Sequence, residues 1–335
     1  MSDQSPLVSV IVSAYTTERY DDLLELLSSL EKQTYRNFEV ILVVEKSREL
    51  LGCLTRHSYG LGALQLKLLF NDGKVKGLSA ARNIGIQAAQ GEIIAFIDDD
   101  AVASPGWLEA MVNTYAEHPE AIGVTGLIEP RWERDSMDWF PREFMWVFAC
   151  TGGDDGLVKT VRNGYGTNMS FRKEAFSRCG LFNLNLGAKG GGVGGKNELV
   201  GEDTEFSMRV NRITGRPIVY SPQVAVKHRA YYYRLKRPFI IRRAYWEGYT
   251  KSLFKRNYRS ASRGNELLSP EKALLKQIMF HLVPSCLADL FRRPVKAFKR
   301  LDVTFTILLF VALGYLRGSL QPSGANREAL CAQSS

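Results

Sequence analysis

Three consecutive carboxylates, Asp98, Asp99 and Asp100, are the residues of this chain whose type and spacing most directly suggest chemistry. They follow the apolar, β-branched run 93–97, which predicts a strand buried in a mostly parallel sheet. A buried strand cannot hold three unpaired charges, because each would cost several kcal/mol. We therefore expect the triplet just past the carboxyl end of the strand, where open α/β sheets bind ligands.

Clustered carboxylate oxygens are the ligands that hard divalent cations such as Mn²⁺ or Mg²⁺ accept, and these cations in turn bind diphosphates. The triplet therefore predicts a site for a metal ion and a diphosphate. The alternative is a solvated acidic turn that binds nothing.

The sequence around this triplet predicts an α/β fold with a doubly wound, mostly parallel sheet, whose strands and helices would position the three carboxylates. Strand and helix patterns alternate over residues 7–13, 21–33, 38–44, 65–70, 76–89 and 93–97. Such alternation favours right-handed β/α winding. Glu45 directly follows one of these strands, as the triplet follows its own.

After the triplet, Pro105 suits the first turn of a helix that runs to Glu117. Further strands are predicted over 121–128 and 164–172. Six glycines between 187 and 195 exclude a stable helix and predict either a loop that closes over substrate or an ordinary connection. The aromatic residues between 130 and 155 predict either a local hydrophobic cluster or a wall that binds the acceptor.

Several motifs in this order resemble those of the family 2 glycosyltransferases, the inverting group with the GT-A fold. The resemblance covers about residues 7–250 and rests on Val10–Tyr15, Glu45, Gly77–Asn83, Asp98–Asp100, Gly166–Arg172 and Gly201–Asp203. Beyond His228, the arginine-rich tail resembles that of members acting on polyprenyl- or dolichyl-linked sugars, such as the archaeal glucosyl-dolichyl-phosphate glucuronosyltransferases.

This resemblance implies a role for particular residues. The implied nucleotide-sugar site consists of Ala14, Tyr15, Glu18, Glu45, Gly77, Arg82, Asp98 and Asp99. Asp100 would hold Mn²⁺ or Mg²⁺, and His228 is a further candidate ligand, although a histidine at the end of a strand can be purely structural.

On the acceptor side, the resemblance makes Asp203 the catalytic base and places Asn168 and Glu202 nearby. An inverting transfer needs one carboxylate to deprotonate the attacking hydroxyl, while the metal neutralises the leaving diphosphate. The alternative is that Glu202 and Asp203 only cap the helix that follows them.

The net charge of +9 is distributed unevenly, with basic residues dense over 227–259 and 292–300. This skew suggests an anionic membrane or another polyanion as a partner. The five cysteines are scattered without CxxC spacing, which is typical of a reducing compartment. Residues 1–6 lack a secretory signal pattern, so we expect the catalytic part in the cytosol.

The C-terminal third predicts membrane association. Residues 273–290 carry apolar side chains at helical spacing, and 303–316 are nearly all apolar but shorter than the about 20 residues that span a bilayer. We expect an interfacial or re-entrant helix, with a true span or a buried helix as alternatives. The expected domains are 1–230, with the GT-A fold, and 231–335, which associates with the membrane.

Together these patterns predict a metal-dependent inverting glycosyltransferase at the cytoplasmic face of the cell membrane, held peripherally or monotopically. It would move a sugar from a nucleotide-sugar, expected to be a UDP-sugar, to a lipid-linked saccharide. One alternative acceptor is a polysaccharide or cell-surface glycan. The other alternative is a non-catalytic binding module; nucleic acid is not expected as a partner.

Overall fold

The computed structural model describes residues 5–58, 64–73, 75, 77–134, 136–153, 155–187, 200–257 and 269–320. The chain divides into two compact units. The first comprises Met1–Glu129 and Asp154–Arg229, and the second comprises Pro130–Gly153 and Ala230–Ser335. The predicted domain division near residue 230 stays a prediction, and most of the predicted glycine loop lies outside the described residues.

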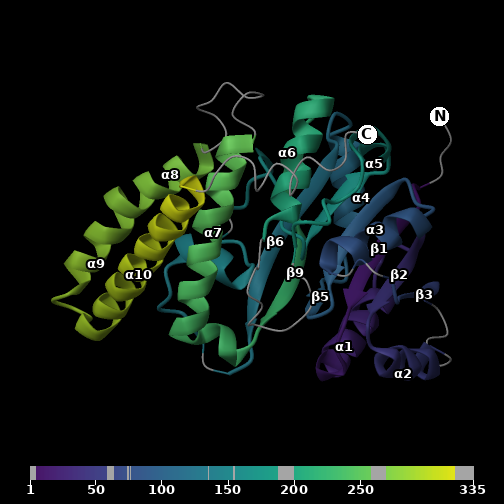
Figure 1. Ribbon diagram of the computed structural model, residues 1–335, viewed down its shortest axis with the longest axis horizontal. Coiled ribbons are helices and arrows are strands. Elements are labelled where there is room, and N and C mark those ends of the chain that lie inside the picture. Colours follow the sequence, from purple (N-terminus) through teal and green to yellow (C-terminus); the bar gives the residue numbers. More distant parts are fainter. Residues whose placement is uncertain are drawn as a thin grey trace. The chain divides into compact units, whose positions relative to one another are not determined.

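The first unit begins with a parallel β/α half, as the alternating runs predict (Figure 1). β1 pairs in parallel with β2 and β4, and β2 pairs in parallel with β3. These strands are β1 (Val8–Ala14), β2 (Phe38–Glu45), β3 (Leu66–Asn71) and β4 (Ile93–Asp98). The intervening helices are α1 (Tyr20–Glu31), α2 (Arg48–Ser58) and α3 (Leu78–Ala88).

Beyond β4 the sheet becomes antiparallel. Its order is β3-β2-β1-β4-β8-β6-β9-β5, and β7 pairs with β9. β8 runs antiparallel to β4 and β6, and β9 runs antiparallel to β5 and β7. The later strands are β5 (Ala101–Ala103), β6 (Gly123–Trp132), β7 (Lys159–Val161), β8 (Met169–Arg172) and β9 (Ile218–Ala230).

The predicted α/β architecture is confirmed, and the sheet is mixed. The sequence patterns missed β5 and β7, because strands of 3 residues are too short to show a periodicity. The helices of this half are α4 (Trp107–Glu117), α5 (Glu174–Cys179) and α6 (Glu202–Thr214).

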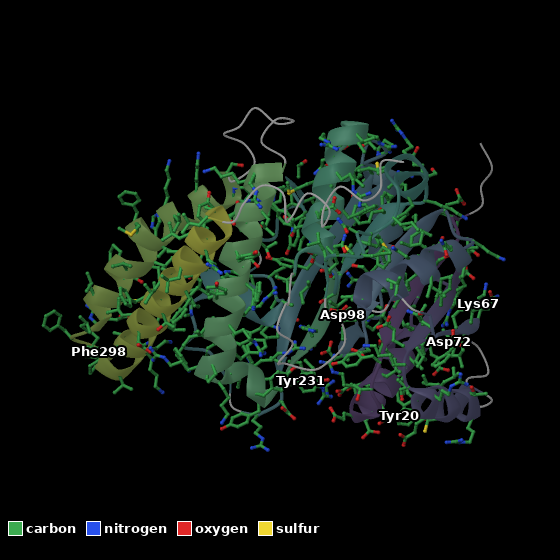
Figure 2. All side chains as sticks on the ribbon, viewed as in Figure 1. Tyr20, Lys67, Asp72, Asp98, Tyr231 and Phe298 are labelled. Atoms are coloured by element: carbon green, nitrogen blue, oxygen red, sulfur yellow. The ribbon has the colours of Figure 1, made fainter. Side chains whose placement is uncertain are left out.

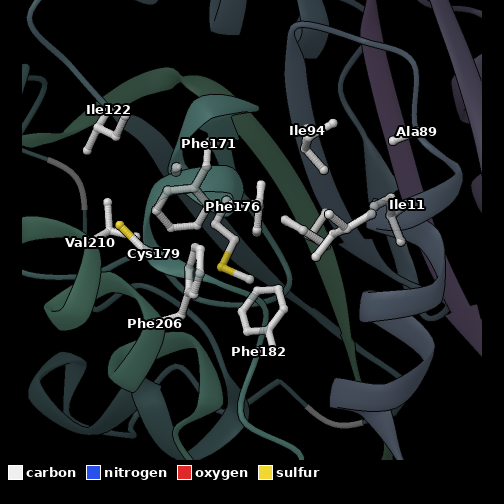
Figure 3. Packing of buried hydrophobic residues seen from close by; sticks show 14 of the residues in the cluster. Ile11, Ala89, Ile94, Ile122, Phe171, Phe176, Cys179, Phe182, Phe206 and Val210 are labelled. Atoms are coloured by element: carbon white, nitrogen blue, oxygen red, sulfur yellow. The ribbon is translucent and has the colours of Figure 1, made fainter. Parts of the chain in front are cut away.

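A cluster of aromatic side chains holds α5 and α6 against one face of the sheet (Figure 3). Phe206 of α6 stacks on Phe176 of α5 with ring centroids 4.9 Å apart, and Phe171 of β8 meets Phe206 edge-on at 4.9 Å. Phe96 of β4 and Phe182 complete the aromatic group. Because α6 begins at Glu202, this packing fixes where the predicted catalytic carboxylates lie.

The second unit is built mainly from helices (Figure 1). They are α7 (Arg237–Asn257), α8 (Ser269–Gln277), α9 (Val283–Asp289) and α10 (Pro294–Ser319). A π-helical turn, Ile278–Leu282, joins α8 to α9. Among the described residues, α10 alone has the length and apolar composition that a membrane crossing requires. It is longer than the apolar run 303–316, because the basic segment before that run is also helical.

The aromatic residues between 130 and 153 pack largely on one another in the second unit. Phe140 lies 4.9 Å from Phe148, and Trp132 lies 5.3 Å from Phe148, centroid to centroid. This packing supports the local hydrophobic cluster, and a contact with the acceptor stays a prediction.

We expect Gly126→Ala to lower the free energy of unfolding by about 2–3 kcal/mol, the usual effect of overpacking. A Cβ at this position of β6 would overlap the carbonyl oxygen of Val224 in β9. Chemical denaturation measures the effect. The matched control is Gly52→Ala inside α2, where the nearest atom would lie at an ordinary 3.7 Å from the new Cβ. The free energy of unfolding of Gly52→Ala should rise by about 0.5–1 kcal/mol from the gain in helix propensity. Equal destabilisation of both variants would contradict this account.

Candidate active site

The carboxyl ends of β1, β2 and β4 bring predicted donor-site residues to one edge of the sheet. The parallel register aligns Ser13 with Asp98 and Ala14 with Val44. Ala14, Glu45 and Asp98 therefore end three neighbouring strands. Figure 2 labels Asp98 at this edge.

Asp98, Asp100 and His228 converge at this edge into a group that could hold a metal ion. One ligand atom from each lies within 4.8 Å of those of the other two. Nε2 of His228 lies 3.0 Å from Oδ1 of Asp100, and both side chains are buried. The antiparallel register that pairs Ala101 of β5 with His228 of β9 creates this proximity. His228 thus lies within a strand, beside the predicted metal ligand.

The middle carboxylate, Asp99, points away from this group and pairs with an arginine that sequence reasoning did not single out. Nη1 of Arg19 lies 2.9 Å from Oδ1 of Asp99 and 3.2 Å from Oδ2 of Asp100. Burial raises the pKa of Asp99 to about 7, although Arg19 opposes the shift. Its Oδ2 is buried without a hydrogen-bond partner in the described part of the chain. Both observations fit a carboxyl group that is partly protonated near neutral pH.

Arg19 belongs to the segment after β1 that also carries Tyr15 and Glu18. Its guanidinium lies 5.6 Å from the centre of the half-buried Tyr15 ring, whereas Glu18 is exposed. The sequence position of Arg19 could have indicated its role, because it follows a strand whose carboxyl end lies at the edge of the sheet where α/β proteins bind ligands. Contacts of Tyr15 and Glu18 with a nucleotide base stay predictions.

Arg82 of α3 is buried and connects two carboxylates from distant parts of the sequence. Nη1 lies 2.9 Å from Oε1 of Glu202, and Nη2 lies 3.3 Å from Oδ1 of Asp98. The rings of Phe96 and Phe182 lie 5.8 and 5.7 Å from its guanidinium carbon. Burial raises the pKa of Glu202, as does neighbouring Asp203, while Arg82 opposes the shift. The predicted contact of Arg82 with the diphosphate stays a prediction. The guanidinium would have to make this contact while it pairs with Asp98 and Glu202.

Asp203, in the first turn of α6, is half-buried and held by two backbone N–H groups. Oδ2 accepts a hydrogen bond from N–H of Gly166 at 3.0 Å, and Oδ1 accepts from N–H of Thr204 at 2.6 Å. Gly201 occupies the N-cap position, without a side-chain cap. A Cβ at Gly166 would overlap the guanidinium of Arg82, so a larger residue there would displace that side chain. The Thr204 contact satisfies one N–H group of the first turn of α6, and the Gly166 contact directs the carboxylate toward the turn before β8.

Glu45 is buried and braces the start of α3. Its Oε1 accepts hydrogen bonds from N–H of Gly77 at 2.8 Å and from Nδ2 of Asn71 at 2.9 Å. Gly77 has φ 119°, a left-handed conformation that favours glycine. Recognition of the base by Glu45 stays a prediction and would have to coexist with these bonds. The predicted place of Gly77 in the nucleotide-sugar site also stays a prediction.

Asn168, predicted on the acceptor side, is fully buried. Its Oδ1 accepts from Nε1 of Trp107 at 2.9 Å, and its Nδ2 donates to the carbonyl groups of Leu127 and Val224. It therefore ties α4 to β6 and β9, and a contact with an acceptor would require exchanging these bonds. The preceding residue, Thr167, was not singled out, yet its hydroxyl donates to Oδ2 of Asp98 at 2.6 Å.

The chemistry of the donor set fits a divalent cation. Asp98 and Asp100 offer hard oxygen ligands and His228 offers an imidazole nitrogen, all acceptable to Mn²⁺ and, for the oxygens, to Mg²⁺. The third carboxylate of the triplet, Asp99, pairs with Arg19, which also contacts Asp100. The edge thus offers residues that could hold a metal ion, and the adjoining helix carries the half-buried carboxylate of Asp203.

Comparison with known proteins identifies relatives of this chain. The family model described as Glycosyl transferase family 2 matches residues 9–180. The glucosyl-dolichyl phosphate glucuronosyltransferase of Haloferax volcanii is 31% identical over 318 residues, covering 94% of this chain and 97% of that protein.

Two solved structures share the fold at low sequence identity. A mannosyltransferase from Pyrobaculum calidifontis, in complex with GDP-Man and Mn²⁺, covers 95% of this chain and 88% of its own with a TM-score of 0.63 at 16% identity. GalNAc-T7 with UDP, GalNAc and Mn²⁺ covers 81% of this chain and 54% of its own, with a TM-score of 0.53 at 18% identity.

The family match covers just over half of the chain, and the Haloferax relative aligns along nearly the full chain. The solved structures agree with the GT-A fold that the motifs predict. This chain is therefore a glycosyltransferase and belongs to glycosyl transferase family 2.

Proposed function

We propose that this enzyme transfers a sugar from a UDP-sugar to a hydroxyl of a lipid-linked saccharide at a membrane surface, with Mn²⁺ or Mg²⁺ as cofactor and inversion at the anomeric carbon. One observation carries the proposal. Ligand atoms of Asp98, Asp100 and His228 converge within 4.8 Å at an edge of the sheet linked through Arg82 and Glu202 to the helix of Asp203.

The donor would be held where β1 and β4 end. Asp98, Asp100 and His228 would bind the metal, which when bound neutralises charge on the departing diphosphate. Arg19 keeps the neighbouring carboxylates charge-balanced, and Thr167 orients Asp98. The complexes of the Pyrobaculum and GalNAc-T7 structures with Mn²⁺ support the choice of a metal.

Asp203 would be the catalytic base. It accepts the proton of the acceptor hydroxyl while that oxygen forms a bond to the anomeric carbon; the bond from this carbon to the diphosphate oxygen breaks, and the diphosphate leaves with the electron pair. The bonds from Gly166 and Thr204 fix the carboxylate before substrate arrives. General-base catalysis from a fixed position contributes about 10²–10⁴ in rate.

The acceptor is proposed from the relative that aligns with nearly the whole chain. Its name gives glucosyl-dolichyl phosphate as its substrate, and the alignment extends into the helical second unit. We therefore infer a dolichyl- or polyprenyl-linked saccharide, reached from the cytoplasmic face. The test compares the rates at which labelled sugar is transferred from UDP-sugars to a polyprenyl-linked glucoside and to a soluble oligosaccharide. A preference for the soluble glycan would favour the polysaccharide alternative.

We expect Asp100→Ala to weaken Mn²⁺-dependent UDP binding at least tenfold and to abolish transfer. The variant would lose a ligand of the metal ion whose positive charge would balance the diphosphate. Isothermal titration with UDP, with and without Mn²⁺, measures the binding separately from activity. The matched control is Asp21→Ala, an exposed carboxylate in the first turn of α1, which should bind UDP normally. Unchanged Mn²⁺-dependent binding in Asp100→Ala would show that the metal lies elsewhere.

For Asp203→Asn we expect turnover to fall by about 10² or more, with UDP affinity nearly unchanged. The amide oxygen can still accept one of the two backbone N–H bonds that the carboxylate accepts. An NH₂ group replaces the second acceptor, and the side chain no longer takes a proton. Steady-state rates and UDP titration separate these effects, and a thermal midpoint close to that of the wild type shows that the fold persists.

Product stereochemistry gives an independent check of the same mechanism. A single displacement with one base predicts a linkage inverted relative to the donor, which NMR of the product reads directly. Near-normal turnover in folded Asp203→Asn, or a retained configuration in the wild-type product, would exclude Asp203 as the base of an inverting transfer.

A further inference from the structure

We propose that the second unit docks in the plane of an anionic lipid leaflet, through one apolar face of the hairpin formed by α8–α9 and α10, and that α10 does not cross the bilayer. The inference deepens the proposed function, on which it rests for the presence of a membrane, by naming the lipid partner and the docking surface.

One face of α10 exposes large apolar side chains at both ends and in the middle of the helix, interrupted by the exposed carboxylate of Asp302. Phe298 and Phe305 are 65% and 70% exposed, and Figure 2 shows Phe298 pointing away from the helices. Exposed apolar residues recur every three to four positions on either side of the exposed Asp302, which interrupts the series between Phe298 and Phe305: Val295, Phe298, Phe305, Leu309, Leu313, Leu316 and Leu320. Such a stripe is typical of a helix that lies at an apolar boundary.

The second arm of the hairpin extends the same kind of surface. On α8–α9 and the turn after it, Met279, Phe280 and Leu287 are exposed, and Phe291 is 95% exposed. α9 packs against α10, and Oδ2 of Asp289 lies 3.9 Å from Nη1 of Arg300 on α10. Exposed aromatic side chains on both arms are costly in water, and burial in lipid would remove that cost.

The opposite face of α10 packs closely on α7. A Cβ on Gly248 of α7 would overlap the carbonyl of Val311, and a Cβ on Gly314 of α10 would overlap the carbonyl of Tyr245. Nearer the start of α10, Arg237 of α7 lies 2.8 Å from the carboxylate of Asp302. The two helices therefore run side by side along the apolar segment of α10.

This packing decides against a membrane crossing. α7 carries the charged residues Arg242, Arg243, Glu247, Lys251 and Lys255 along the same stretch. Lys251 pairs with Glu247 at 3.3 Å and with Glu271 of α8 at 2.9 Å. If α10 crossed the bilayer, α7 and these charges would enter the hydrocarbon with it, which is costly. An orientation in the plane of the membrane leaves α7 on the aqueous side.

A basic hollow at the start of α10 provides the charge complementarity. It is an open depression of about 420 Å³ whose lining includes the apolar Trp139, Pro294 and Val295 and the basic Arg293, Lys296 and Lys299. Nζ of Lys299 lies 5.6 Å from the centre of the Trp139 ring. Cations beside an indole suit the phosphate of an anionic phospholipid at the membrane interface, next to the apolar stripe. A nucleic acid would meet these cations but would leave the stripe in water.

Flotation with vesicles tests the surface on the full chain. We expect the protein to float with phosphatidylcholine–phosphatidylglycerol vesicles and the double variant Phe298→Ser/Phe305→Ser to lose at least tenfold in binding. The matched control is Leu157→Ser, a 62% exposed leucine of the first unit, which should float normally. Equal flotation of the Phe298/Phe305 variant would overturn the proposal.

The lipid charge is tested by Lys296→Gln/Lys299→Gln, which should reduce the preference for anionic over neutral vesicles at least fivefold. Lys32→Gln, at the exposed end of α1, is the control. An unchanged preference, or salt-resistant binding to RNA that competes with the vesicles, would contradict an anionic leaflet as the partner.

Depth measurements distinguish the two orientations. Single spin-labelled cysteines replace Phe298, Phe305, Leu309 or Leu316, in a background of Cys53→Ser and Cys331→Ser. An in-plane helix places all four labels at similar depth, whereas a crossing helix places the middle labels deepest. Similar depths support the proposal, and a central maximum overturns it. None of these assays involves sugar transfer, so a protein that docks but does not transfer refutes only the proposed function.

Discussion

Charge balance at the carboxyl edge of the sheet is the constraint on which the rest of the site depends. Four carboxylates meet there with little exposure to water, and two arginines pair with them: Asp98, Asp99, Asp100 and Glu202 with Arg19 and Arg82. Carboxylates that were buried without these partners would destabilise the fold or bind protons. Asp99, which lacks a partner for one oxygen among the described residues, shows that tendency in its raised pKa.

The pairing of Arg82 with two carboxylates links the proposed donor site to the proposed catalytic base. Arg82 joins Asp98, at the proposed metal, to Glu202, the neighbour of the proposed base. Gly166 lies against that guanidinium and also donates its N–H to Asp203. A shift of Arg82 would therefore disturb both carboxylates together, so donor binding and base position are set by one buried side chain. We regard Arg82 as a positioning residue in this sense.

Local patterns in the sequence were sufficient for the parts of this fold that local physics determines. The apolar run before Asp98 correctly predicted a buried strand that gives way to the triplet, because unpaired charges cannot stay inside a strand. β4 ends at Asp98, and Asp99 and Asp100 are buried beside Arg19; a contact of the triplet with ligand stays a prediction. The approach of His228 to Asp100 was not predictable in this way, since it depends on the pairing of β5 with β9. Glu45 was expected directly after a strand and is the last residue of β2. Its bonds to Asn71 and Gly77 were not foreseen, because they depend on the pairing of β2 with β3 and on the start of α3.

For α10, too, the sequence pattern alone could not determine the structural role of the helix. Composition allowed three readings of the run 303–316, because an apolar helix can cross a membrane, lie on it or fill a core. The choice between them depends on what packs beside the helix. Gly248 and Gly314 let the backbones of α7 and α10 touch, and this contact binds a charged helix to an apolar one. Two glycines in distant parts of the sequence therefore constrain the orientation of α10 more strongly than its own hydrophobicity does.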